Sequence, residues 1–175
     1  MKTRRVSIRS ATTVSKVLWP EFVVVNDLVF FSWAAPEMVD LNMWYDKTEV
    51  EQYLNHTHVL DLFSHRTYLD EDPWIDQSHE DFKLSCEFGV MWVETVAEKL
   101  AKDFPDRNFW VYYTEQDNPI IRFHQDHPKE IPWLRKENFL AEIEKGTIII
   151  KQVFGYNKAL KAQPRAAGTP QSGAP

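Results

Sequence analysis

The chain has 175 residues, which is enough for one well-formed core and too few for two ordinary domains. Hydrophobic residues make up 43% and aromatic residues 14%, a composition that excludes disorder over most of the length, and the net charge of −6 disfavours sequence-independent binding to nucleic acid. The single cysteine, Cys86, permits no internal disulfide, and no apolar run reaches the roughly 18 residues of a bilayer span, so we expect a soluble cytoplasmic protein.

The first part of the chain is basic and then strongly apolar. Residues 1–20 carry five basic residues and no acid, a composition shared by transit peptides and by ordinary solvated N-termini, of which we favour the second. Residues 22–33 predict either two short strands that turn at Asn26 and Asp27 or one buried strand, and the pattern does not separate these. We assign residues 1–40 to an N-terminal extension.

Two helices are predicted next. Thr48 can cap a helix over 48–65, with Glu51 completing a capping box. The acid cluster and proline within 68–77 break the periodicity and predict a loop, with a short strand before it left open. A long helix is predicted over 78–104, because Ser78 can cap it, acids follow in its first turn, and apolar residues recur every three or four positions. Cys86 lies on that apolar stripe as a core residue.

The last third of the domain is predicted to be a sheet. Residues 109–114 and 120–125 flank a loop rich in turn-forming residues and predict an antiparallel hairpin. Residues 136–155 predict a second hairpin at the centre of the sheet, turning at 144–146, with Glu137 at the start of its apolar face. The tail over 162–175 contains nothing to anchor it and is predicted to be disordered.

Three stretches carry a resemblance to a known family. They read TEVEQYLNHTHVLDLFSHRTYLDED at 48–72, SHEDFKLSCEFGVMWVETVAEKLAKDFPDRNFWVYYTEQDNP at 78–119 and ENFLAEIEKGTIIIKQVFGYNKALKA at 137–162. Together they resemble the NTF2-like superfamily and, among its SnoaL-like enzymes, the phenazine-biosynthesis A/B family. The resemblance implies an α+β fold for 41–161, an NTF2-like cone in which helices pack on the concave face of a curved antiparallel sheet, and a homodimer formed through the exposed sheet face.

The resemblance also implies a site. By position, His79 would hold a substrate carboxylate and Glu137 would act as the catalytic acid/base. Physical chemistry allows both roles, since a carboxyl group in an apolar cone has a raised pKa and a histidine in a first helical turn can help to bind an anion. The alternative for both residues is ordinary exposure to solvent.

The function implied is that of a cofactor-independent biosynthetic enzyme. It would act on a small cyclic substrate that bears a carboxylate, by condensation, cyclisation, isomerisation or dehydration. Aromatic residues are the candidate lining of its pocket, although each could equally be plain core. These residues are Trp92, Trp110, Tyr112, Phe123, Phe139 and Phe154.

Two further hypotheses come from the residues themselves. His58, Asp61 and His65 would share one face of the predicted first helix, but ordinary surface histidines are the favoured explanation, so we expect no metal and no cofactor. The competing function is a non-catalytic acidic binding protein, such as an immunity protein that neutralises a basic toxin. Its binding region would be 37–81, where twelve acids stand against Lys47 and Arg66.

Overall fold

The computed structural model describes residues 7–63, 68–69, 72–116 and 118–157, which form a mixed α+β fold with antiparallel sheets. The helical elements are α1 (Ile8–Leu18), η1 (Leu41–Met43), α2 (Lys47–Leu54), η2 (Leu60–Leu62), α3 (Glu80–Asp103), η3 (Lys136–Asn138) and α4 (Leu140–Lys145). The strands are β1 (Phe22–Val25), β2 (Leu28–Phe31), β3 (Thr57–His58), β4 (Tyr68–Leu69), β5 (Asp72–Ile75), β6 (Asn108–Thr114), β7 (Ile120–Gln125) and β8 (Ile148–Phe154). No helix within these residues is long and apolar enough to cross a membrane.

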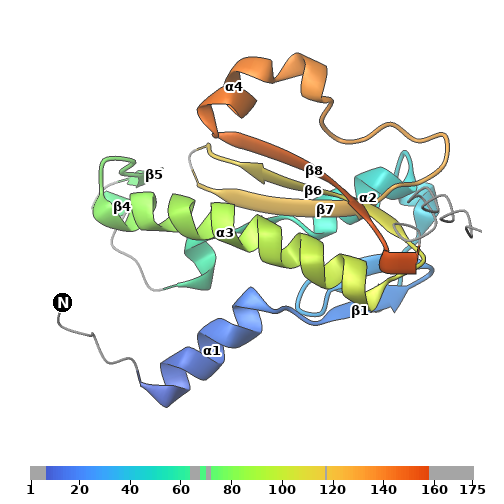
Figure 1. Cartoon of the computed structure of the whole chain (residues 1–175), viewed down its shortest axis with the longest axis horizontal. Coiled ribbons are helices and arrows are strands. Elements are labelled where there is room, and N and C mark those ends of the chain that lie inside the picture. The colour runs from blue at the N-terminus through green and yellow to red at the C-terminus, as the bar shows by residue number, and fades with distance from the viewer. Residues whose placement is uncertain (1–6, 64–67, 70–71, 117, 158–175) are drawn as a thin grey trace, which may run out of the picture.

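The main sheet has four strands in the order β3-β7-β6-β8, with α3 on one face and α4 on the other (Figure 1). The predicted hairpin of β6 and β7 is confirmed, and its register pairs Val111 with Phe123. Alternation along β6 directs Phe109, Val111 and Tyr113 towards the core beneath α3. Tyr112 on the opposite face belongs to a separate cluster.

The long helix α3 confirms the prediction for 78–104, with one difference at its start. His79 is the N-cap, and its Nδ1 accepts the Asp81 backbone N–H at 3.1 Å, whereas Ser78 lies outside the helix. The apolar stripe predicted from periodicity is buried and includes Trp92, Val96 and Leu100. Gly89 allows close contact with β6, because a Cβ there would lie 2.5 Å from Cε2 of Tyr113.

The chain between 22 and 31 is a hairpin, which decides between the two structures left open by the sequence. Asn26 and Asp27 both have positive φ, 52° and 68°, as a two-residue type I′ turn requires. Every residue of β2 is buried. Val29 and Phe31 pack in the main core with α3, so part of the expected N-terminal extension contributes to the same core as the sheet.

The prediction of one helix over 48–65 is wrong. Helix α2 ends at Leu54, and its N-cap is Asp46, which accepts the Glu49 backbone N–H at 2.7 Å. After Asn55 the chain forms β3 and η2, so the shared helical face expected for the metal-like group does not exist. Of that group, His58 is in β3 and Asp61 in η2, while His65 lies outside the described residues.

The central hairpin predicted over 136–155 is wrong in its first half. Residues 136–145 form η3 and α4, and Gly146 ends α4 with a left-handed φ of 78°. Strand β8 exists, but it is the edge strand next to β6 rather than the centre of the sheet. Phe139 and Ile143 cover the second face of the sheet, at which the homodimer was expected. The homodimer stays a prediction.

Two remaining expectations concern flanking segments. The loop predicted over 68–77, with a short strand allowed before it, contains two short paired strands, β4 and β5. The tail over 162–175 lies outside the described residues.

Candidate functional site

The two residues proposed for catalysis lie in different settings. Glu137 is exposed in η3 and is not part of a strand, contrary to its expected place on the apolar face of a hairpin. His79 is half-exposed at the start of α3, where its Nδ1 is used as a helix cap. Within the described part of the chain no hydrogen bond or ion pair joins these two side chains, and their catalytic roles stay predictions.

The six predicted lining residues do not lie around one cavity. Trp92 and Phe123 are buried in the main core beneath α3. Trp110, Tyr112 and Phe139 lie in the cluster on the opposite face of the sheet. The sixth, Phe154, is 49% exposed at the end of β8. Since a sheet separates the first two from the next three, these side chains act as core on both faces.

A buried carboxylate lies at the junction of α2, β2 and β7. Glu51 is fully buried, and its Oε1 accepts the Val29 N–H at 2.6 Å and the Gln125 Nε2–H at 2.9 Å. Its Oε2 accepts the Gln125 N–H at 2.8 Å and lies 2.8 Å from Nε2 of His127. A buried charge is tolerated when hydrogen bonds saturate it in this way. Glu51 is therefore a structural link and not a helix cap.

Asn55 extends this link by one helical turn. Its Oδ1 accepts the Phe31 N–H at 3.0 Å, while its Nδ2 donates to the carbonyls of Val29 at 2.9 Å and Phe123 at 3.3 Å. Glu51 and Asn55 thus bind the edges of β2 and β7, whose main-chain groups would otherwise be buried without partners. Helix α2 is fixed in place by its buried side.

The third buried polar group is the pair of His124 and Tyr112, next to the ring of Trp133. His124 is buried, and its Nδ1–H donates to the Gln125 carbonyl at 2.7 Å, so its Nε2 accepts the hydroxyl of Tyr112 at 2.8 Å. Burial lowers the pKa of His124 and raises the pKa of Tyr112. Both groups are neutral and mutually satisfied, which indicates a structural role.

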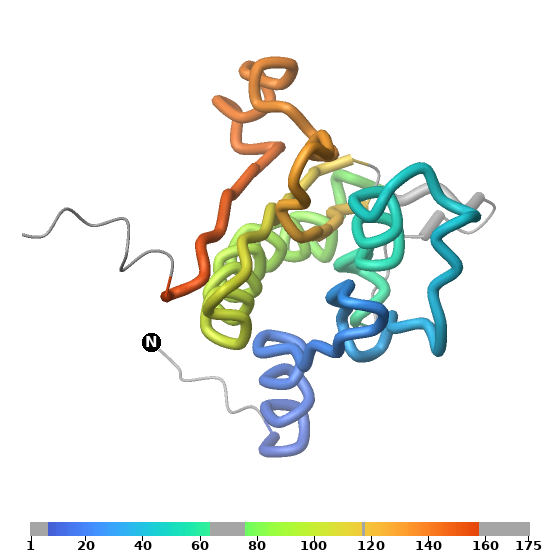
Figure 2. Tube along the Cα trace, turned by 90° about the vertical axis from the view of Figure 1, so that its right-hand side faces the viewer, coloured from blue at the N-terminus to red at the C-terminus, as the bar shows by residue number. Residues whose placement is uncertain are grey.

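Several large apolar and aromatic side chains are exposed in the segment before α2 and on α2 itself. We call the exposed side chains of residues 37–49, together with Tyr53, the acidic aromatic surface. Its apolar and aromatic members are Met38, Leu41, Met43, Tyr45 and Tyr53, all exposed. Met43 is 81% exposed and Tyr45 93% exposed. The segment that carries the first four residues forms the outer edge of the molecule in Figure 2 (cyan). Apolar and aromatic side chains this exposed on neighbouring positions are typical of a site for another protein.

This surface is held by hydrogen bonds to side chains. Asp40 Oδ1 accepts the Asn42 N–H at 3.0 Å and so caps η1. Glu49 Oε2 accepts the Tyr45 N–H at 2.6 Å. The ring of Trp44 lies 5.4 Å from that of Tyr53, centroid to centroid, and packs inward. The exposed residues are therefore presented on an ordered backbone.

A second carboxylate holds the start of α2 from outside. Glu130 Oε2 accepts the Thr48 N–H at 2.8 Å. Burial alone would raise the pKa of Glu130, but the hydrogen bonds from Thr48 and Lys47, together with the charge of His127, lower the pKa below its ordinary value. The α2 end of the acidic aromatic surface is thereby tied to the connection between β7 and η3.

The charge of this surface is negative. Four acids in the segment, Glu37, Asp40, Asp46 and Glu49, are exposed or half-buried and stand against Lys47. The hydrogen bonds that Asp40, Asp46 and Glu49 accept come from neutral amide N–H groups, which do not cancel their charge. The sequence indicated the acids of this region, but it did not reveal that Glu51 is buried or that apolar side chains are exposed among the rest.

Comparisons of this chain with protein families, with curated proteins and with solved structures found no match. Its function is therefore inferred from the geometry. Among the described residues, no group of three or more histidine, cysteine or acidic side chains is arranged to hold a metal ion.

Proposed function

We propose that this protein is a non-catalytic binding protein whose acidic aromatic surface docks a basic surface of a partner protein. The observation that carries the proposal is the exposure of Met43 and Tyr45 on a backbone held by capping carboxylates. Methionine and aromatic residues are enriched at interface centres, and acids around them select a partner of opposite charge. A preordered surface also loses little conformational entropy on binding.

The charge argues against a second copy of the chain as the occupant. Two copies meeting through this surface would bring the same carboxylates together, and like charges at an interface are costly. A basic partner gains from the same charges. Neutralisation of a basic toxin is one such activity, and coexpression with a toxin encoded next to this protein tests that case directly.

The proposal is tested by capturing partners on the immobilised full chain, identifying them, and measuring the affinity of the purified partner by calorimetry. The double variant Met43→Ser/Tyr45→Ser should weaken binding by about 30-fold or more, since central apolar residues dominate interface energies. Binding should also weaken as the salt concentration rises from about 50 to about 300 mM, because salt screens the attraction between the acidic surface and the basic partner.

Leu140→Ser is the matched control, because Leu140 is an exposed apolar residue on α4. It should leave the affinity unchanged. A captured partner that binds the double variant as tightly as the wild type would refute the proposal. Self-association that the double variant abolishes would instead assign the surface to a dimer of this chain.

The second proposal is the NTF2-like enzyme, acting on a carboxylate-bearing cyclic substrate as a cytoplasmic homodimer. The fold part of this proposal is supported by α3, which lies across one face of an antiparallel sheet. The cytoplasmic location is supported by the single cysteine, which can form no internal disulfide. With turnover of such a substrate as the assay, Glu137→Gln and His79→Gln should each lower kcat by about 100-fold. Unchanged kcat in both variants would remove the two residues from the mechanism.

A further inference from the structure

A groove of about 830 Å³ lies between α1 and the residues that flank the hairpin of β1 and β2, namely Glu21 before it and Ser32 and Trp33 after it. Its walls include four residues of α1 at positions i, i+3, i+4 and i+7, namely Arg9, Thr12, Thr13 and Lys16. This spacing places them on one side of the helix. Helix α1 thus turns a polar and cationic stripe towards the groove. The volume is in the range of small-molecule sites.

The opposite wall presents an aromatic platform. One face of the Trp33 indole stacks on Phe31, with ring centroids 4.5 Å apart and planes at 10°, and Phe31 in turn stacks on Trp92 at 5.9 Å. Phe31 and Trp92 are fully buried, whereas Trp33 is 47% exposed and lines the groove. The ring is therefore supported from behind by Phe31, and part of its accessible surface lines the groove. A planar ligand could stack there without reordering the protein.

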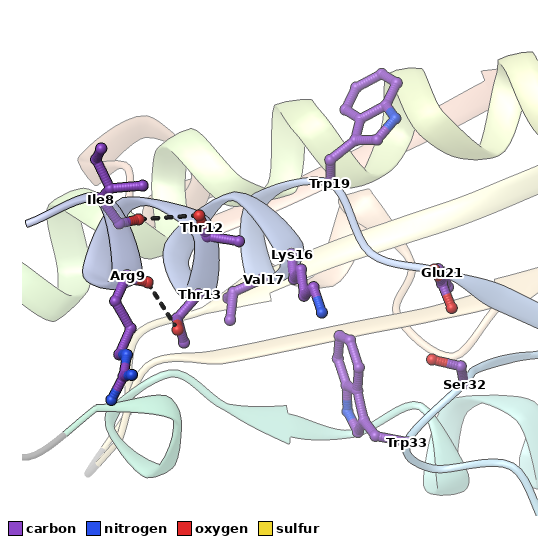
Figure 3. Close-up of a pocket in the computed structure, with 10 residues that line it drawn as sticks. All are labelled: Ile8, Arg9, Thr12, Thr13, Lys16, Val17, Trp19, Glu21, Ser32 and Trp33. Carbon is purple, nitrogen blue, oxygen red and sulfur yellow. Dashed lines mark hydrogen bonds between the residues drawn. The ribbon is translucent and has the colours of Figure 1, made fainter.

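The charges of the groove favour an anion. Figure 3 shows the Lys16 side chain on α1 above the Trp33 ring. Arg9 lies at one end of the groove and Glu21 near the other. Within the described residues neither Arg9 nor Lys16 has an ion-pair partner. Two cations against the single acid Glu21 leave one net positive charge among the lining residues. The hydroxyls of Thr12 and Thr13 donate to the carbonyls of Ile8 and Arg9, so they have no proton left for a carboxylate, and Arg9 and Lys16 are the groups on this wall that attract an anion.

We infer that this groove is a binding site for a small planar aromatic carboxylate. The ring stacks on Trp33, and the carboxylate lies against the stripe of α1 where Arg9 and Lys16 project. Glu21 disfavours a second negative charge at the other end, so the ligand class is a monoanionic aromatic acid. The site is separate from the acidic aromatic surface and does not depend on it.

Calorimetry of the full chain with 2-naphthoate tests this inference. We expect a Kd of about 0.1 to 1 mM, as befits a small ligand in an open groove. The neutral analogue 2-naphthylmethanol should bind about 5-fold more weakly or worse, and so should the non-aromatic cyclohexanecarboxylate. The double variant Arg9→Gln/Lys16→Gln should weaken 2-naphthoate binding about 10-fold, and Trp33→Leu about 5-fold.

The charge variants keep the test decisive, because Arg9 and Lys16 are exposed and their replacement leaves the core intact. Lys145→Gln, an exposed cation at the end of α4, is the matched control and should bind as the wild type does. Three results would each overturn the inference. They are no heat of binding at roughly 2 mM 2-naphthoate, equal affinity for the neutral analogue, and an affinity of the double charge variant within about 2-fold of the wild type.

Discussion

Replacing Glu51 with glutamine tests whether the buried carboxylate holds α2 between β2 and β7. The two carboxylate oxygens receive the backbone N–H groups of Val29 and Gln125 at 2.6 and 2.8 Å. An amide offers one acceptor oxygen, and its NH2 group must face one of these donors. At least one buried main-chain N–H then loses its acceptor, which costs about 1–3 kcal/mol, and the remaining hydrogen bonds lose their charge assistance.

The expected loss is about 2–4 kcal/mol in the free energy of unfolding, since relief from burying a charge offsets part of the cost. That is a large share of the roughly 5–15 kcal/mol of a typical domain. Urea unfolding followed by circular dichroism measures this loss. The dependence of the free energy of unfolding on urea concentration should be the same in the variant and the wild type. Glu87→Gln, on the exposed side of α3, is the control and should change the stability by less than about 0.5 kcal/mol. A similarly small change in Glu51→Gln would refute the structural role of the carboxylate.

Three further predictions concern single positions. Burial lowers the pKa of His56 from 6.5 to about 4, so between these pH values the unfolded chain binds a proton that the folded protein does not bind. The free energy of unfolding therefore decreases as the pH falls from about 6.5 towards 4. In urea unfolding, His56→Gln should lose less stability than the wild type over that range. Gly155→Ala places a Cβ 2.3 Å from the Pro105 carbonyl oxygen and should cost about 3 kcal/mol, whereas Gly146→Ala meets only its positive φ and should cost about 1 kcal/mol; equal thermal unfolding shifts would contradict this. Burial raises the pKa of the Cys86 thiol to about 11. Iodoacetamide at pH 8 should therefore label the native protein about 100-fold more slowly than the urea-unfolded chain. Comparable labelling rates would be inconsistent with the burial of the thiol.

The elements predicted correctly have strong local signals. The stripe of α3 repeats over 24 residues, and both strands of the β6–β7 hairpin are aromatic or branched around a loop of turn-forming residues. The turn at Asn26 and Asp27 was visible as one of two alternatives because both residue types tolerate positive φ. In these places the local preference and the tertiary packing agree.

The segment over 137–145 was misassigned because its pattern fits two periods. Phe139 and Ile143 fit the alternation of a strand, but they are also four residues apart, and both pack against the second face of the sheet from one side of a short helix. Helix formers between them and Gly146 as a left-handed C-cap were the signals for the helix. With that segment a helix, Glu137 lost its expected place at the edge of a pocket.

The role of Glu51 could not be predicted from local pattern. In the sequence it stands three residues after Thr48, which suggests a capping box, but its partners Val29 and Gln125 are 22 and 74 residues away. Only the tertiary structure brings these main-chain donors to one carboxylate. The same holds for the groove, since Trp33 and the stripe of α1 become opposing walls only when the hairpin folds onto the core.

The hydrogen bonds on the two sides of α2 hold the backbone of the proposed interface, the acidic aromatic surface. Glu51 and Asn55 fix the inner side of the helix to two strand edges, and Tyr53, between them in sequence, projects outward. The chain before the helix is tied to it, because Asp46 accepts the Glu49 N–H as the N-cap and Glu49 accepts the Tyr45 N–H. The hydrogen bonds from neutral N–H groups hold the carboxylates of Asp46 and Glu49 in position and do not neutralise their charge. A basic partner would therefore meet a negative surface whose ordering cost was already met when the domain folded.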